Sequence, residues 1–205
     1  MMKYYLEIKF LPDDDISIHF LWSKIYKQLH LALASIKNVE NTVNVGFSFP
    51  QYRFDLKKST GFIGEKLRVF ASSEDTLNHL EVHKWLSRYV DYVHISSIKA
   101  VPMDKVTGYA IYKRKQVKSS AERLARAEAK KGRYSYEDAL AHYRKFVQTT
   151  NLPYVQMLSD SSSTSLAEDS KHHYKLFIEK QPVEKSETQV FSTYGLSSQS
   201  SVPEF

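Results

Sequence analysis

The spacing of apolar and polar residues changes period several times along the first hundred positions, and each change marks a predicted element. Apolar residues that alternate with polar ones are typical of a β-strand with one buried face, whereas apolar residues three or four apart are typical of an amphipathic helix. The predicted elements run strand, helix, strand, strand, helix, strand, over residues 4–10, 16–37, 42–49, 66–71, 72–86 and 92–101.

The order β-α-β-β-α-β is the ferredoxin-like, split βαβ pattern. We therefore predict an α+β protein with a ferredoxin-like domain at residues 1–102 and a smaller α+β domain at 103–205. Residues 51–65 are predicted to be a polar loop, with Gly61 and Gly64 as turn residues. Ser72 or Ser73 is the expected cap of the second helix.

The first helix carries one apolar stripe at helical spacing. Its members are Ile18, Leu21, Ile25, Leu29, Ala32 and Ile36. By the same periodicity, His30 lies roughly opposite Leu21, Ile25 and Leu29 and is not expected to be a core histidine. An ordinary surface histidine is the simplest interpretation of His30 from periodicity alone.

The second half of the chain is less regular. Residues 107–117 are expected to be extended and to lead into a basic helix at about 119–132, with a second helix at 135–147. Short strands are predicted at 153–158, 174–180 and 188–193. The serine-rich runs 159–170 and 197–201 are predicted to be flexible because they offer little apolar surface to a core.

Positive charge is concentrated in one strip, residues 113–133. The strip holds nine Lys/Arg and two Glu, a local charge of +7, while the whole chain carries +6. On a helix, Arg123, Arg126 and Lys130 share one narrow stripe. A solvated charged face is the usual explanation of a charge run, but acids are too few here for salt-bridge lacing. Nucleic acid is therefore the favoured partner of the strip, with an acidic protein or a membrane surface as less specific alternatives.

Composition excludes several classes of protein. The 205 residues are 42% hydrophobic and include no cysteine, which rules out a disulfide framework or a cysteine-based zinc site. No apolar run approaches membrane-spanning length, and no signal peptide opens the chain, so we expect a cytoplasmic protein with no membrane partner. No P-loop, dinucleotide fingerprint or nucleophile-elbow motif is present.

Histidine pairs are the remaining candidates for metal chemistry. His79 and His83 are four apart on a predicted helix, a spacing that can bind zinc, but no third ligand is in register. His172 and His173 are adjacent and so do not share a strand face. We expect no metal site and no cofactor.

Several short segments, in order and spacing, resemble the CRISPR-associated endoribonuclease family of type I-F systems, which processes the precursor of the guide RNA. The resemblance runs nearly from end to end. The segments that carry it are residues 4–8, 27–33, 45–50, 64–68, 116–119 with 122–124, 152–155, 174–178, and 194–197 with 202–203.

The resemblance implies roles for individual residues. His30 matches the catalytic histidine, and Tyr194 matches a tyrosine that helps to place it. Ser159 matches the serine that holds the attacking 2′-hydroxyl, with Ser161 as an alternative. The RNA-binding positions that the resemblance and the basic strip together indicate are Arg114 and Gln116 (base edges of the stem), Tyr174 (stacking at the stem end), and Arg123, Arg126, Lys130 and Lys131 of the basic helix.

The resemblance also implies the reaction. We expect a metal-independent endoribonuclease that cleaves precursor crRNA at the 3′ side of the repeat hairpin by 2′-hydroxyl attack, leaving a 2′,3′-cyclic phosphate. The expected partners are the CRISPR repeat RNA hairpin and other subunits of the type I-F surveillance complex, with a transposition adaptor as a further candidate. The alternatives are a non-catalytic hairpin-binding module, in which His30 has no role, and a basic scaffold subunit.

Overall fold

The computed structural model describes residues 1–55, 57, 60–117, 121–145, 150–159 and 172–205, with the backbone alone at 123, 159 and 172. These residues form two compact units, Met1–Arg114 with Leu152–Phe205 and Lys115–Asn151. Residues 152–205 group with the N-terminal part because the buried side chains of Val155 and Leu176 join the same core. The predicted boundary between domains 1–102 and 103–205 does not coincide with the boundaries of these units. The units are defined by contacts within the chain and the predicted domains by fold type, so the predicted domains stay a prediction.

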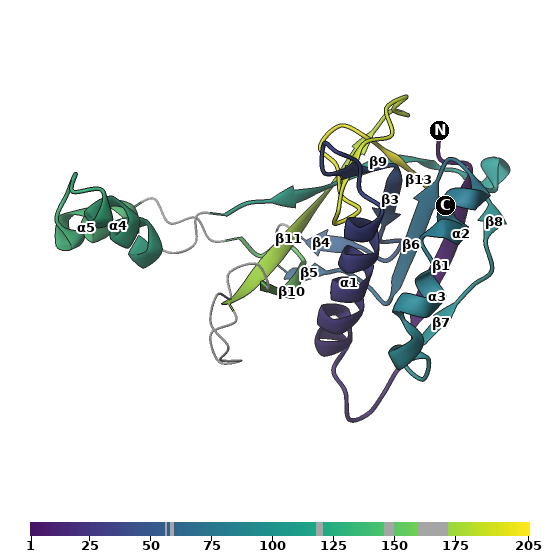
Figure 1. Ribbon diagram of the computed structural model, residues 1–205, viewed down its shortest axis with the longest axis horizontal. Coiled ribbons are helices and arrows are strands. Elements are labelled where there is room, and N and C mark those ends of the chain that lie inside the picture. The colour runs from purple at the N-terminus through teal and green to yellow at the C-terminus, as the bar shows by residue number, and fades with distance from the viewer. Residues whose placement is uncertain (56, 58–59, 118–120, 146–149, 160–171) are drawn as a thin grey trace. The chain divides into compact units, whose positions relative to one another are not determined.

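The first unit is built on a mixed α/β arrangement with a five-stranded sheet (Figure 1). Its strand order is β3-β6-β1-β7, β8 also pairs with β1, and all these pairs are antiparallel. The strands are β1 (Tyr4–Phe10), β3 (Val45–Ser48), β6 (Lys66–Ala71), β7 (Val93–Ile95) and β8 (Lys99–Ala100). The predicted strands 4–10 and 66–71 are confirmed, whereas 42–49 and 92–101 are each split in two, the former into β2 (Thr42–Val43) and β3.

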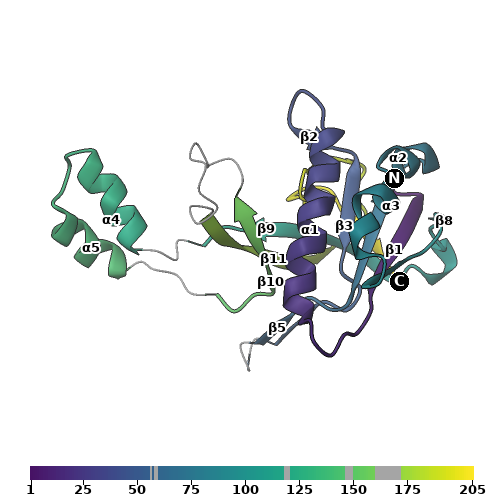
Figure 2. The same cartoon turned by 60° about the horizontal axis from the view of Figure 1, so that its bottom comes forward.

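Alternation along β1 separates two faces of this sheet. Leu6, Ile8 and Phe10 are buried, and the Phe10 ring lies 4.3 Å from that of Trp22 on α1 (Ile18–Ser35). Tyr5 belongs to the opposite face, where its ring meets Phe205 at 5.1 Å. Helices α1, α2 (Glu74–His79) and α3 (Val82–Trp85) lie on one side of the sheet (Figures 1 and 2).

The predicted helix at 72–86 is wrong as a single element. Ser73 caps α2 by accepting from the N–H of Thr76, which confirms one of the two expected caps. Glu81 then adopts a left-handed conformation (φ 49°), which an α-helix cannot contain, so a separate helix α3 begins after it. The chain continues through the 3₁₀ turns η1 (Ser87–Tyr89) and η2 (Met103–Lys105) on either side of β7 and β8.

The buried face of α1 is wider than its predicted stripe. Leu21, Ile25, Leu29 and Ala32 are buried as expected, but so are other side chains between them. The additional buried residues are Trp22, Tyr26 and Leu33. Two of these have polar tips that need partners when buried, and both find backbone carbonyls: Trp22 Nε1 donates to Gly64 O (2.8 Å) and Tyr26 Oη to Tyr194 O (2.7 Å).

A second, four-stranded sheet completes the first unit, in the order β10-β11-β9-β13. Its strands are β9 (Gly108–Lys115), β10 (Tyr154–Ser159), β11 (His172–Val183) and β13 (Val202–Glu204). The predicted extended segments at 107–117, 153–158 and 174–180 are confirmed, while β13 was not predicted. Of the predicted strand 188–193, only β12 (Phe191–Ser192) forms, paired with β2.

Two predicted loops are more ordered than expected. Residues 51–65 contain a hairpin of β4 (Arg53–Asp55) and β5 (Thr60–Phe62). The run 197–201 is not a flexible tail, because Ser200 and Ser201 are buried and each Oγ accepts a backbone N–H, from Val190 and Ser186 respectively. The composition of the run predicted solvation, but these hydroxyls are satisfied inside the fold.

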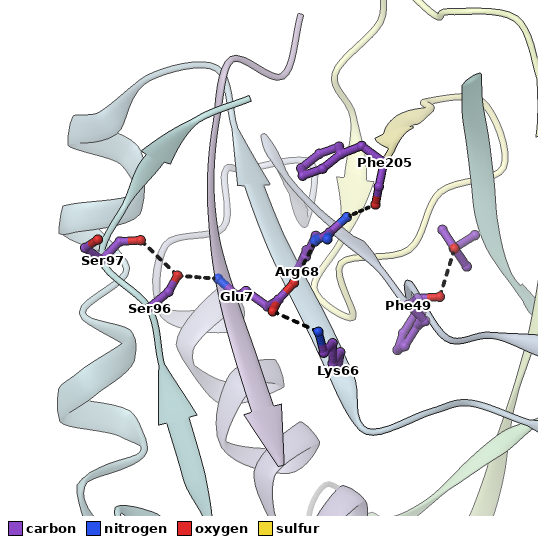
Figure 3. Close-up of polar contacts among 8 residues, drawn as sticks. Glu7, Phe49, Lys66, Arg68, Ser96, Ser97 and Phe205 are labelled. Carbon is purple, nitrogen blue, oxygen red and sulfur yellow. Dashed lines mark hydrogen bonds and ion pairs between the residues drawn. The ribbon is translucent and has the colours of Figure 1, made fainter. Parts of the chain in front are cut away.

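A polar cluster fastens the C-terminal segment to the five-stranded sheet (Figure 3). Arg68 Nε donates to Glu7 Oε2 (2.9 Å), and its NH1 donates to the backbone oxygen of Phe205 (2.5 Å). The same guanidinium lies 4.0 Å from the Phe205 ring centroid, within cation–π range. Lys66 approaches Glu7 at 3.5 Å, and Ser96 Oγ accepts the N–H of Glu7.

The second unit is a pair of packed helices, α4 (Ala121–Lys130) and α5 (Tyr136–Arg144). Ala121 and Ala125 of α4 and Ala139 of α5 are buried, so small side chains line the contact between the two helices. Gly132 follows α4 with φ +69°, the left-handed conformation expected where glycine ends a helix. The predicted caps Ser119 and Ser120 lie outside the described residues. Within the described ranges, every helix is too short or too polar to cross a lipid bilayer.

Candidate active site

His30 lies against a turn that is remote in sequence. Its ring stacks on that of Tyr194 with centroids 4.1 Å apart and an interplanar angle of 1°. Its Nδ1 is 2.8 Å from the backbone oxygen of Thr193. The two partners are more than 160 positions along the chain from His30, so only the tertiary fold brings them together.

The prediction that His30 is not a core histidine is confirmed, but the buried face of the helix extends closer to His30 than the predicted stripe did. His30 is half-buried, one turn after the fully buried Tyr26 on α1. Residues four apart on a helix share a face, so His30 lies at the edge of the buried stripe rather than across from it. The apolar pattern concealed this because Tyr26, with its polar tip, was not counted in the stripe.

The turn that holds Tyr194 has little conformational freedom. Gly195 has φ +69°, and a Cβ built on it would meet the ring of Phe47 at 2.4 Å. Phe47 is fully buried in β3, and its N–H donates to Gly195 O (2.9 Å). Within the turn, the N–H of Gly195 donates to Ser192 O and that of Ser192 to Leu196 O, each at 2.8 Å. Glycine is therefore required here both by the backbone angle and by the close approach of the aromatic ring.

Two further predicted residues join His30 and Tyr194. The hydroxyl of Tyr174 on β11 is 2.7 Å from the hydroxyl of Tyr194. The Arg114 guanidinium, near the end of β9, is 5.5 Å from the Tyr174 ring centroid and 5.6 Å from that of Tyr194. Both distances are within cation–π range, so a permanent positive charge lies over the tyrosine pair. Four residues predicted for the site are thus brought together from α1, β9, β11 and the turn after β12.

Ser159 is placed only by its backbone. It is the last residue of β10, and its Cα pairs with that of His172 in the antiparallel register between β10 and β11. In the same register Met157 pairs with Tyr174, so Ser159 is two positions along β10 from the strand position opposite Tyr174. Ser161, the alternative serine, lies outside the described residues.

The remaining predicted RNA-binding residues belong to the second unit, so their position relative to His30 stays a prediction. Gln116, Arg126 and Lys130 are exposed. Arg123 lies on α4, and only its backbone is described. Gln116, Arg126 and Lys130 are therefore available to a ligand on the surface of their own unit.

Lys131 is not a free cation. Its Nζ is 2.8 Å from Glu128 Oε1, and Arg133 NH1 is 3.8 Å from Glu128 Oε2. The hydrogen bond from Lys131 is the main cause that lowers the pKa of the Glu128 carboxyl, which is therefore ionised at neutral pH. One acid at the end of α4 is thus shared by two cations, in an i,i+3 pair with Lys131, whereas the sequence argued only against i,i+4 lacing as the explanation of the basic strip.

Metal ligation finds no support in the first unit's histidine pairs. His79 ends α2 and His83 lies in α3, so the break at Glu81 removes the one-helix spacing on which the zinc alternative depended. Among the described residues, no three or more His, Asp or Glu side chains are grouped in a way that would hold a metal ion.

Sequence reasoning missed Tyr26 and Thr193. Thr193 contributes only a backbone carbonyl, which no side-chain pattern can reveal. One feature of the sequence could have indicated Tyr26. It lies four residues before His30, and residues four apart on a helix lie on the same face. Burial raises the pKa of Tyr26 well above its usual value, and the nearby Tyr194 and Tyr174 raise it further.

This chain is similar to several known proteins. A family model described as CRISPR-associated protein (Cas_Csy4) matches residues 5–205. A "CRISPR-associated endonuclease Cas6/Csy4" from Escherichia coli (strain UTI89 / UPEC) is 33% identical over 210 residues, 100% of both chains. The protein of the same description from Pseudomonas aeruginosa (strain UCBPP-PA14) is 32% identical over 206 residues, again 100% of both. A solved structure titled "An RAMP protein binding different RNA substrates" aligns over 100% of both chains at 11% identity, but its TM-score of 0.34 is too low to support a shared fold.

Proposed function

Because this chain belongs to the family of CRISPR-associated Csy4 proteins, it is an endoribonuclease that processes the precursor of the guide RNA, and we propose that it cuts without a metal, by attack of a ribose 2′-hydroxyl. The observation that carries the proposed mechanism is the contact between His30 Nδ1 and Thr193 O (2.8 Å). This contact decides which nitrogen of the neutral imidazole carries the proton.

A backbone carbonyl can only accept a hydrogen bond, so Nδ1 carries the proton in this contact. In the neutral imidazole the other nitrogen, Nε2, is then unprotonated and can act as a proton acceptor. The parallel ring of Tyr194 at 4.1 Å limits the rotation of the imidazole. His30 is thus a general base whose tautomer and orientation are both set by the protein.

In the proposed step, the 2′-oxygen upstream of the cut attacks the adjacent phosphorus while its proton passes to His30 Nε2. The bond from phosphorus to the 2′-oxygen forms, and the bond to the 5′-oxygen of the next nucleotide breaks. The leaving 5′-oxygen takes up a proton and becomes a 5′-hydroxyl. The upstream product ends in a 2′,3′-cyclic phosphate, so the RNA supplies its own nucleophile and no metal-bound water is needed.

Ser159 is proposed to align the 2′-hydroxyl, with Ser161 as the alternative. The support for Ser159 is its place at the end of β10, two positions from the residue paired with Tyr174. Arg114 brings a positive charge over the tyrosine pair next to His30, where it can stabilise charge that develops on the phosphate. Base reading by Arg114 and Gln116, and stacking by Tyr174 at the stem end, remain proposals.

RNA binding is proposed to rest on the second unit. Lys115–Asn151 contains nine Lys/Arg and four Asp/Glu, a formal charge of +5, and α4 carries the exposed cations Arg126 and Lys130. The proposed ligand is the CRISPR repeat hairpin, cut at the 3′ side of its stem. We further propose that the protein stays bound to the mature crRNA as a subunit of the type I-F surveillance complex, with a transposition adaptor as a further candidate partner.

The first hundred residues are proposed to be a ferredoxin-like domain. The support is the spatial strand order β3-β6-β1-β7, in which all pairs are antiparallel. Along the sequence, α1 follows β1 and α2 follows β6, as a βαββαβ plan requires. In this proposal β2, β4, β5 and β8 are additions to a βαββαβ plan.

The test is paired. Cleavage rate in excess EDTA and dissociation constant are measured for the native repeat hairpin, for a hairpin with deoxyribose at the position upstream of the cut, and for the His30→Ala protein. Loss of the general base is expected to lower the rate by about 10²–10⁴-fold. The deoxy hairpin is expected to remain uncut, because it lacks the attacking atom, and both changes are expected to leave binding unaltered.

His19→Ala is the matched control, because His19 is an exposed histidine on the same helix. Its cleavage rate is expected to equal that of the unmodified protein. Cleavage of the deoxy hairpin at the native rate would exclude 2′-hydroxyl attack, and a requirement for added Mg²⁺ would exclude the metal-independent route. A tight complex with no cut product under any of these conditions would instead support the non-catalytic binding module.

A further inference from the structure

Tyr26 is a fully buried tyrosine, and its hydroxyl has no role in the substrate binding or the reaction proposed above. The side chain is 0% exposed, and its ring packs against Phe47 (5.9 Å between centroids, 82° between planes) and Phe49 (6.4 Å, 21°). Phenylalanine would fill this space equally well. The hydroxyl therefore needs an explanation of its own, since burying it costs free energy unless it is hydrogen-bonded.

The hydroxyl donates to Tyr194 O at 2.7 Å. The raised pKa of Tyr26 keeps this group protonated, and so a donor, at any working pH. Its acceptor belongs to the residue whose ring stacks on His30. The bond thus joins the interior of α1 to the turn that faces the imidazole.

Three successive carbonyls of this turn are each held by a different group. Thr193 O accepts from His30, Tyr194 O from Tyr26, and Gly195 O from the N–H of Phe47 (2.9 Å). Two of the three donors, Tyr26 and His30, are side chains four apart on α1. One face of this helix therefore donates hydrogen bonds to two consecutive carbonyls, those of Tyr194 and Thr193. The distance from the helix to the Thr193 carbonyl is therefore set by Tyr26 as well as by His30.

His30 cannot hold its own partner in place. The bond from Nδ1 to Thr193 O selects the reactive tautomer only while that carbonyl stays where it is. A group that fixes the neighbouring carbonyl from the same helix removes the freedom that would let Thr193 O turn away. In metal sites, groups that hydrogen-bond to a ligating histidine likewise fix its tautomer and its orientation.

We propose that Tyr26 is a positioning residue for RNA cleavage: by fixing the carbonyl of Tyr194 from within α1, it keeps Thr193 O against His30 Nδ1 and so keeps Nε2 unprotonated toward the RNA. This inference rests on the proposed role of His30 as general base. A purely structural Tyr26 would stabilise the fold without affecting which nitrogen of His30 carries the proton.

The test uses Tyr26→Phe, which removes the hydroxyl and keeps the ring. The matched control is Tyr52→Phe, because the Tyr52 hydroxyl also donates to a backbone carbonyl, Ile178 O on β11, at 2.9 Å. Three quantities are measured for each protein: the single-turnover cleavage rate at saturating protein, the dissociation constant for the hairpin, and the urea midpoint. The tautomer of His30 is read directly from the ¹⁵N chemical shifts of its ring in the free protein.

For Tyr26→Phe, the cleavage rate is expected to fall about tenfold, the equivalent of one hydrogen bond to a buried carbonyl, with no change in the dissociation constant. The ¹⁵N shifts are expected to move from those of a single Nδ1–H form toward a mixture of both tautomers. Tyr52→Phe is expected to lower the urea midpoint while leaving the His30 shifts and the cleavage rate as they were.

Unchanged ¹⁵N shifts of His30 in Tyr26→Phe would overturn the proposal, and so would equal losses of rate in the two variants. The proposed function fails differently: if the unmodified protein does not cut in EDTA, or if His30→Ala cuts normally, His30 is not the base. The ¹⁵N measurement does not depend on cleavage, so it still decides whether Tyr26 controls the tautomer.

Discussion

Replacing Gly195 with alanine adds one methyl group at the narrowest point of the turn that faces His30. The built Cβ lies 2.4 Å from Cγ of Phe47, 2.5 Å from Cδ2 and 2.7 Å from Cδ1. The Phe47 ring cannot retreat, because the side chain is 1% exposed and also meets Tyr26. The added methyl therefore has to be accommodated by movement of the turn itself.

Two separate costs add up in this variant. The φ of Gly195 is +69°, in the left-handed region. Placing an L-residue such as alanine there costs roughly 1–2 kcal/mol. Overpacking a tightly filled interior costs a further amount of about 1–3 kcal/mol. The expected loss in free energy of unfolding is therefore about 2–5 kcal/mol.

Two other glycines of the chain separate these costs. Gly132 has the same φ of +69° but nothing within 4 Å of its built Cβ, so Gly132→Ala measures the backbone cost alone. Gly46 has no left-handed φ, but its Cβ would lie 2.6 Å from the Phe191 ring, so Gly46→Ala measures the cost of crowding. Each control carries one of the two costs, so each is expected to lose less free energy of unfolding than Gly195→Ala.

Urea unfolding is followed by two probes, because the glycines lie in different units. Trp22 and Trp85 both belong to the first unit, so tryptophan fluorescence reports on Gly46 and Gly195. Far-UV circular dichroism also registers α4 and α5, beside Gly132. At a temperature where each variant is folded, Gly195→Ala is also expected to cut more slowly than Gly46→Ala, because the displaced turn carries Thr193 O away from His30.

If Gly195→Ala is no less stable than Gly132→Ala, the ring of Phe47 does not confine the turn. If its cleavage rate equals that of Gly46→Ala at matched stability, the turn does not control His30. Either result would refute the reasoning that connects the packing of β3 with the chemistry of α1.

Two predictions concern RNA recognition. Neutralising Arg123, Arg126 and Lys130 together is expected to weaken binding to any stem and to lower the log–log salt slope by somewhat under one unit per lost phosphate contact, measured by fluorescence anisotropy; an unchanged slope would place the RNA elsewhere. Arg114→Ala or Gln116→Ala is expected to reduce discrimination between the correct stem-base pair and a swapped pair by about 1–3 kcal/mol, measured by competition between the two hairpins; equal losses on both RNAs would show contacts to phosphate alone.

The regular strands and the existence of α1 could be predicted because their signals are local. Alternation in residues 4–10 and 66–71 reflects burial on one side of a sheet, and β1 and β6 have those bounds. The break at Glu81 could not be predicted, since no glycine or proline marks it and a left-handed glutamate is set by its surroundings. The burial of Ser200 and Ser201 was hidden for a similar reason: the backbone N–H groups that satisfy these hydroxyls belong to Val190 and Ser186, which are brought near only by the fold.

The candidate site shows the same division. Resemblance indicated His30, Tyr194, Tyr174 and Arg114 individually, and the described contacts join all four. Periodicity alone showed that His30 is not a core residue but missed how close it lies to the buried face, because it treated Tyr26 as outside the apolar stripe. A tyrosine or tryptophan within a helix has an apolar body and a polar tip, so it belongs to the buried face whenever a backbone carbonyl is available to the tip.

Most of the formal charge of the chain belongs to the second unit. Lys115–Asn151 carries a formal charge of +5, which leaves +1 for the much larger first unit. In that larger unit, the proposed base is governed by uncharged contacts: a backbone carbonyl, a stacked tyrosine ring and a buried hydroxyl. Salt screens long-range attraction between charges but has little effect on short, partly buried contacts of this kind. The proposed attraction for the polyanion and the contacts that orient the proposed base therefore depend on different residues, so the first is expected to weaken with added salt more than the second.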